Sequence, residues 1–154
     1  MNISYLLKPK KIAVVGASER ESSFGGDTCR NIMDFSNPSK YFFINPKRET
    51  IFGQKCYKSI EEVPENFELV IICTPQNAVV DILRSAAKKG CKGAVVYASG
   101  YSETGSFEGK EAERELIEIC KELDIALLGP NCAGFINYID DVYSFAFIYE
   151  KRDR

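Results

Sequence analysis

The chain has 154 residues, of which 45% are hydrophobic and 12% aromatic, so it can bury one sizeable core and is expected to form one domain. Lysine and arginine number 20 against 22 acidic residues, and a formal charge of −2 argues against a general nucleic-acid binder. No apolar run approaches the roughly 20 residues that a bilayer-spanning helix needs. Lys8, Lys10 and Lys11 follow the first apolar stretch, the reverse of a secretory signal. We therefore expect a soluble, cytoplasmic domain with no nucleic-acid or membrane partner.

The side-chain inventory excludes several kinds of chemistry within this chain. It contains no histidine, so Ser-His and Cys-His catalysis, His-ligated zinc and phosphohistidine all need residues from elsewhere. No two cysteines form a C-x-x-C pair, which argues against thioredoxin-like redox and zinc-ribbon sites. We expect free, mostly buried thiols at positions 29, 56, 73, 91, 120 and 132.

Five short, continuous apolar runs alternate with longer amphipathic segments along the chain. Continuous apolar runs are typical of strands that are covered on both faces. The strands are predicted at 12–16, 41–45, 69–73, 94–97 and 125–128, and helices at 25–35, 75–89 and 108–123. The second helix is expected to have Thr74 as its N-cap, Pro75 at its first position and Gly90 as its stop. Residues 59–62 read as a capping box over a short helix that ends near Pro64.

This alternation of strands and helices predicts the fold class. A repeated βαβ pattern gives a doubly wound parallel α/β sheet, here a Rossmann-like domain of about five parallel strands with helices on both faces. We assign residues 1–140 to this domain. Residues 141–154 are interpreted as the start of a linker toward a further domain, because the charged last four residues carry no stop signal.

Ligands of open parallel sheets bind beyond the carboxyl ends of the strands, so the loops there are the candidate site. The loop after the first strand begins Gly16-Ala17-Ser18 and reaches Phe24 and Gly25, where a helix opens. Glycines at both ends allow backbone amides to approach a phosphate near the helix N-terminus. The spacing is not G-x-G-x-x-G, and a plain strand-to-helix turn is the alternative.

The end of the second strand discriminates between nucleotides. NAD-binding domains usually place an acidic residue there to bind the ribose hydroxyls, whereas this chain has Asn45-Pro46-Lys47-Arg48. Lys47 or Arg48 would attract a phosphate on the ribose, which favours CoA or NADP over NAD. A merely solvated pair of charges is the alternative. Two further loops, Cys73-Thr74-Pro75 and Ala98-Ser99-Gly100, are polar enough to line a cleft or to serve as ordinary connections.

Five motifs occur together in the order and spacing of a CoA-binding domain. They lie at 11–18 (KIAVVGAS), 44–47 (INPK), 72–75 (ICTP), 98–105 (ASGYSETG) and 129–134 (GPNCAG). This set resembles the N-terminal domain of ADP-forming (NDP-forming) acyl-CoA synthetases, relatives of the succinyl-CoA synthetase alpha subunit. The resemblance covers residues ~8 to ~140, nearly the whole chain.

The resemblance implies a set of CoA-binding residues. Gly16, Ala17, Ser18, Phe24 and Gly25 would face the pantetheine and phosphates, and Asn45, Pro46 and Lys47 the adenosine end, with Lys47 on its phosphate. The remaining groove would be lined by Cys73, Thr74, Pro75, Ala98, Ser99 and Gly100. Asn131 and Cys132 would lie near the thiol end, although a structural turn is the favoured role of that loop. No residue of this chain is expected to be catalytic or to bind metal.

The family's reaction converts an acyl-CoA, ADP and phosphate into the free acid, CoA and ATP, through an acyl phosphate and a phosphohistidine carried by a following flavodoxin-like domain. ATP or ADP and Mg would be bound by other synthetase domains or by an ATP-grasp subunit. This chain has no histidine, so we expect it to supply CoA binding and not the complete reaction. Two alternatives stay open: a stand-alone CoA-binding protein with a regulatory role, and an NAD(P)-binding module.

Overall fold

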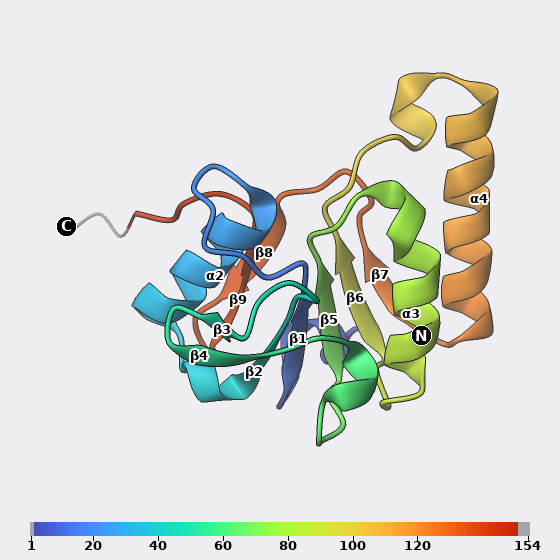
Figure 1. The fold of residues 1–154 in the computed structure, drawn as a ribbon. Coiled ribbons are helices and arrows are strands. Elements are labelled where there is room, and N and C mark those ends of the chain that lie inside the picture. The colour runs from blue at the N-terminus through green and yellow to red at the C-terminus, as the bar shows by residue number, and fades with distance from the viewer. Residues whose placement is uncertain (1, 151–154) are drawn as a thin grey trace.

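The structure, a computed structural model, describes residues 2–150. Its centre is a seven-stranded sheet in the order β3-β4-β2-β1-β5-β6-β7, parallel throughout except for the edge pair β3 and β4 (Figure 1). The strands are β1 (Ile12–Val15), β2 (Tyr41–Ile44), β3 (Thr50–Ile51), β4 (Gln54–Tyr57), β5 (Leu69–Ile72), β6 (Gly93–Val96) and β7 (Ala126–Leu128). A separate antiparallel hairpin joins β8 (Gly134–Asn137) and β9 (Val142–Phe145).

Helices cover both faces of the sheet. The helix α2 (Phe24–Phe35) and the β8–β9 hairpin lie on one face, and α3 (Val79–Ala87) and α4 (Phe107–Glu122) pack side by side on the other (Figure 1). The short N-terminal helix α1 (Ser4–Leu7) contacts β6 and β7. Within residues 2–150, no helix is both long and apolar enough to cross a bilayer.

The strand β5 shows why its sequence is apolar without interruption. Leu69 and Ile71 belong to the core under α2, while Val70 and Ile72 belong to the core under α3 and α4. Successive side chains of a strand point to opposite faces, so a strand with helices on both sides buries every residue. All four residues of β5 are fully buried. The Rossmann-like fold class is thereby confirmed.

The strand count corrects the expectation of about five. All five predicted strands are present, but β3 and β4 add an edge ribbon and β8 and β9 a hairpin outside the sheet. These four strands are two to four residues long, and β4 (sequence QKCY) is only partly buried. A short strand at a sheet edge lacks the continuous apolar run that identifies a central strand.

Two helix starts also differ from the prediction. Pro75 is extended (φ −61°, ψ 162°), so a 3-10 turn (Gln76–Ala78) precedes α3, and Thr74 lies one residue outside the cap position. The expectation that Thr74 caps this helix is wrong. Ser59 precedes a 3-10 turn (Ile60–Glu62) without a side-chain cap bond, and Glu62 accepts instead from the backbone N–H of Lys58.

The packed unit continues past residue 140. Val142, Tyr143, Ser144 and Ala146 are buried against α2 and the sheet, so this stretch of the segment interpreted as a linker is part of the core. Residues 151–154 of that segment lie outside the described residues. A further domain beyond them stays a prediction. All six cysteines are free and four are buried, which confirms the prediction for the thiols.

Candidate functional site

The candidate site lies where the strand order of the sheet reverses. After β1 the chain moves by way of α2 to β2 on one side, whereas β5 pairs with the other side of β1. Val15 is level with both Ile44 and Ile72, so the loops that follow these three strands start at the same height. Such a switch point is where ligands bind in open α/β sheets.

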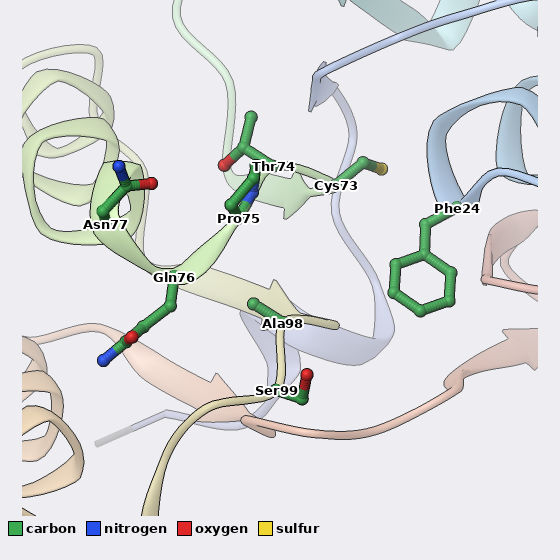
Figure 2. A pocket seen from close by; sticks show the side chains of 8 residues that line it. All are labelled: Phe24, Cys73, Thr74, Pro75, Gln76, Asn77, Ala98 and Ser99. Atoms are coloured by element: carbon green, nitrogen blue, oxygen red, sulfur yellow. The ribbon is translucent and has the colours of Figure 1, made fainter. Parts of the chain in front are cut away.

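A first cavity of about 550 Å³ opens between the loops after β1, β5 and β6. Figure 2 shows the ring of Phe24 on one side, with the sulfur of Cys73 directed toward it, and the turn that starts α3 on the other. Its lining residues are Phe24, Cys73, Thr74, Pro75, Gln76, Asn77, Ala98 and Ser99. The wall is therefore apolar near Phe24 and polar at the helix start.

A second cavity of about 630 Å³ adjoins the first and shares Thr74 and Pro75 with it. It lies between the loops after β1, β2 and β4 and the first turns of α3. Its lining residues are Val15, Gly16, Ile44, Asn45, Pro46, Lys47, Lys58, Ser59, Ile60, Glu61, Thr74, Pro75, Asp81, Ile82 and Ser85. The two cavities, which adjoin at Thr74 and Pro75, are together called the groove, and the lining of the second one includes the charged residues Lys47, Lys58, Glu61 and Asp81.

The loop after β1 is folded tightly against the start of α2. A Cβ on Gly25 would lie 2.0 Å from the carbonyl oxygen of Gly16, so only glycine fits there. Gly16 itself has a φ of +85°, which favours glycine. The backbone N–H groups of Gly16 and Ala17 both donate to the carbonyl of Ile44, at 3.0 and 3.1 Å. Both amides are therefore hydrogen-bonded to β2, and Gly16, which has no side chain, lines the second cavity.

Asn45 joins the first two loops. Its side-chain N–H donates to the carbonyl of Ala17 at 2.8 Å, and its side-chain oxygen accepts from the backbone N–H of Lys47 at 2.9 Å. Arg48 is directed to Glu19, with a nitrogen–oxygen distance of 3.4 Å. Of the two cations that the sequence offered for a phosphate, Lys47 is therefore the one that lines the groove.

The loop after β6 is held by its own carboxylate. Glu103 accepts hydrogen bonds from the backbone N–H groups of Gly100 and Tyr101. Desolvation is the largest single influence and raises the pKa of its carboxyl group, but the backbone hydrogen bonds together outweigh it and lower that pKa. The Gln76 side-chain oxygen lies 3.3 Å from where a Cβ on Gly100 would be. The loop is thus packed against the start of α3, which fixes the position of Ser99 at the first cavity.

The loop of Asn131 and Cys132 contributes to neither cavity. Asn131 has a φ of 52°, and its backbone N–H donates to the carbonyl of Ala98. The Cys132 thiol donates to the carbonyl of Val96 at 3.4 Å, and burial raises its pKa. This geometry is that of a structural turn.

The other thiols near the groove are poor nucleophiles. Burial raises the pKa of Cys29 to about 12 and that of Cys73 well above its ordinary value. A thiol acts as a nucleophile in its ionised form, so these side chains serve as apolar wall and core.

The structure brings ten of the sixteen predicted site residues to the groove. These are Gly16, Phe24, Asn45, Pro46, Lys47, Cys73, Thr74, Pro75, Ala98 and Ser99. Ala17, Ser18, Gly25, Gly100, Asn131 and Cys132 are not among the lining residues and shape the loops behind it.

Several lining residues were not predicted from the sequence. Gln76 and Asn77 follow Pro75 directly, and their position at the start of a helix was the available signal. Asp81 and Ser85 lie one turn apart on α3, and Lys58 follows the unpredicted strand β4. A residue pattern alone does not reveal which face of α3 turns toward the groove.

Comparison with known proteins agrees with this architecture. Residues 10–138 match the family model described as CoA binding domain. The chain is 40% identical over 151 residues to an ADP-forming acetate–CoA ligase of Methanocaldococcus jannaschii, covering 97% of this chain and 21% of that protein. It is 36% identical to the alpha subunit of the ADP-forming acetate–CoA ligase II of Pyrococcus furiosus, covering 88% of this chain and 29% of that subunit.

The fold match is equally extensive. The dinucleotide forming acetyl-coenzyme A synthetase 1 of Ca. Korarchaeum cryptofilum, in complex with phosphate and ADP, superimposes with a TM-score of 0.85 and 31% identity. The match covers 94% of this chain and 30% of that one. The chain therefore spans less than a third of the length of these relatives. The family match over most of the chain, together with the groove at the switch point, shows that the chain belongs to the CoA-binding domain family of ADP-forming acyl-CoA synthetases.

Proposed function

We propose that this chain is the part of an ADP-forming acyl-CoA synthetase that binds CoA, with the nucleotide half in the second cavity and the pantetheine in the first. The observation that carries the proposal is the groove at the switch point, with Lys47 after β2 where an NAD-binding domain has an acidic residue. A cation there attracts the 3′-phosphate that distinguishes the ribose of CoA. Lys47 argues against NAD but would also suit the ribose phosphate of NADP, and the match to the CoA-binding domain family favours CoA over NADP.

Different residues of the groove would bind different parts of CoA. Lys47 would bind the ribose phosphate, while Ile44, Ile60 and Ile82 offer apolar surface to a purine ring. Phe24 and Ala98 would line the pantetheine path toward the thiol end. The remaining predicted residues would act by shaping the loops: Ala17, Ser18, Gly25, Gly100, Asn131 and Cys132.

For the whole protein we propose the reversible reaction that makes the free acid, CoA and ATP from an acyl-CoA, ADP and phosphate. The relatives named above are ADP-forming acetate–CoA ligases or a subunit of one, which supports this class of reaction. This chain has no histidine, so a phosphohistidine would come from other synthetase domains, and the nucleotide would be bound by these domains or by an ATP-grasp subunit. A cytoplasmic location is also proposed, supported by six free thiols.

The proposal is tested by calorimetric titration of the chain with CoA, 3′-dephospho-CoA, NAD and NADP. CoA should bind, and loss of the 3′-phosphate should weaken binding about 5- to 30-fold, as expected for ~1–2 kcal/mol from an exposed charge-assisted hydrogen bond. Lys47→Ala should weaken CoA binding by a similar factor and leave 3′-dephospho-CoA unchanged, because both changes remove the same contact.

The matched control is Lys110→Ala, on the exposed surface of α4 away from the groove, which should bind CoA like the wild type. Binding of NAD or NADP without binding of CoA would show that the ligand assignment is wrong. Absence of heat with all four ligands would contradict the proposal that this chain binds CoA by itself.

A further inference from the structure

Thr74 carries an unusual hydroxyl group. Among the side chains of residues 2–150, its Oγ1 is the buried oxygen or nitrogen atom that has no hydrogen-bond partner. Buried polar groups are nearly always paired, because leaving one unpaired forfeits its hydrogen bonds to water. An unpaired hydroxyl in a protein that otherwise satisfies its buried groups therefore calls for an explanation.

Local structure does not provide that explanation. A threonine before a helix ordinarily caps it, but Thr74 lies outside the cap position and makes no cap bond to the turn that begins at Gln76. A valine has nearly the same shape as threonine and no polar atom, and would fill this space without the unpaired group. The unpaired hydroxyl thus lowers the stability of the free protein and makes no compensating hydrogen bond there.

The position of Thr74 relates the hydroxyl to the ligand groove. Thr74 lines both cavities, and its methyl carbon lies 3.2 Å from where a Cβ on Gly16 would be. Figure 2 shows the hydroxyl oxygen on the far side of the residue from Phe24. A rotation about the Cα–Cβ bond takes threonine from one staggered rotamer to another and can exchange the places of the methyl and hydroxyl groups. The hydroxyl would then lie toward Gly16, which lines the second cavity.

We propose that the Thr74 hydroxyl is a binding group for the pyrophosphate of CoA, unpaired in the free protein and donating to a phosphoryl oxygen when the ligand is bound. This inference rests on the proposed function, which places the nucleotide and the pantetheine in adjoining cavities. The pyrophosphate joins these two halves of CoA, so it must pass the wall that Thr74 and Pro75 form between the cavities. A phosphoryl oxygen is a strong acceptor for a hydroxyl donor.

The inference predicts effects of opposite sign on binding and on stability. Thr74→Val removes the hydroxyl and keeps the shape, so the free chain should unfold at an equal or higher urea concentration than the wild type. The same variant should bind CoA about 5- to 10-fold more weakly. Thr74→Ser keeps the hydroxyl and should bind CoA within about twofold of the wild type.

The test uses three ligands on the full chain: CoA, 3′-phospho-ADP, which contains the pyrophosphate, and adenosine 3′-monophosphate, which does not. Thr74→Val should weaken binding of the first two and leave that of adenosine 3′-monophosphate, measured by displacement of CoA, unchanged. Equal CoA affinity in Thr74→Val and wild type would overturn the inference and leave the proposed function standing. Equal weakening of all three ligands would also overturn it, because the hydroxyl would then not act on the pyrophosphate. Failure of the wild type to bind CoA would overturn the proposed function, and the inference with it.

Discussion

The attachment of the C-terminal strand to α2 gives a sharp prediction about stability. Asn31 is 1% exposed and makes three hydrogen bonds to the last residue of β9 and the stretch that follows it. Its side-chain N–H groups donate to the carbonyls of Phe145 (3.3 Å) and Phe147 (2.7 Å), and its side-chain oxygen accepts from the backbone N–H of Tyr149 (2.9 Å). One side chain thus binds three backbone groups at the end of β9 and in the stretch after it.

Asn31→Ala should lower the free energy of unfolding by about 3 kcal/mol. Each of the three bonds contributes about 1 kcal/mol, and the carbonyl of Phe145 keeps a second donor in the hydroxyl of Thr28. Asn31→Asp keeps the acceptor for Tyr149 but loses both donors and places a carboxylate against two carbonyls, so it should be at least as destabilising. The matched control is Asn66→Ala at an exposed position, which should stay within about 0.5 kcal/mol of the wild type.

Urea unfolding followed by tyrosine fluorescence measures these differences, and hydrogen exchange locates them. In Asn31→Ala the amide of Tyr149 should exchange much faster, while amides of β5 should lose protection only as far as global stability falls. A loss of less than 1 kcal/mol for Asn31→Ala, with the Tyr149 amide still protected, would refute the argument that these three bonds secure the strand.

Two further predictions concern the first loop and the alkaline limit of stability. Gly25→Ala should lower the free energy of unfolding by about 3 kcal/mol and weaken CoA binding, because the new methyl group would collide with the carbonyl of Gly16. Gly53→Ala has open space around it and only a positive φ to adopt, so it should lower the free energy of unfolding by about 1–2 kcal/mol. The reverse ranking in urea unfolding would count against the close approach of Gly25 to Gly16. Burial raises the pKa of Tyr41 to about 12, opposed by its hydrogen bond with Ser36, so the folded state keeps the phenol protonated while the unfolded chain ionises near pH 10. The free energy of unfolding should therefore fall between about pH 10 and pH 12, by about 2 kcal/mol from this group, and Tyr41→Phe should reduce that fall.

The central strands and the helices could be predicted because their burial determines the pattern of apolar residues in the sequence. A strand such as β5 that is covered on both faces can hold only apolar residues, which makes it visible as an uninterrupted run. The ribbon of β3 and β4 lies at the sheet edge, where solvent permits polar residues, and it left no such run. The hairpin of β8 and β9 owes its position to contacts with α2, more than a hundred residues away in sequence, which no local pattern contains.

The candidate site was predictable to the extent that strand ends determine it. The loops after β1, β2, β5 and β6 start from one edge of the sheet, because parallel strands in register bring their carboxyl ends together there. Ligand binding by these loops stays a prediction. Thr74 shows the limit of this reasoning. The sequence T-P before an apolar helix favours a cap, but Pro75 is extended, a 3-10 turn begins at Gln76 and α3 begins only at Val79. The threonine hydroxyl is left unpaired in a residue that lines the groove.

Some polar groups around the groove are hydrogen-bonded within the protein and build its walls, whereas others are available to a ligand. The amides of Gly16 and Ala17 and the side chain of Asn45 are engaged with neighbouring loops. Two amides of the glycine-containing loop, which in other nucleotide-binding folds offers its amides to phosphate, are therefore occupied within the protein. In the proposed binding mode, recognition of a charged ligand depends on two side chains, Lys47 at the ribose phosphate and Thr74 at the pyrophosphate. For this reason the exchange of a single hydroxyl for a methyl group at position 74 tests the site more directly than any change in the glycines, which would alter the fold of the loop and the ligand contacts together.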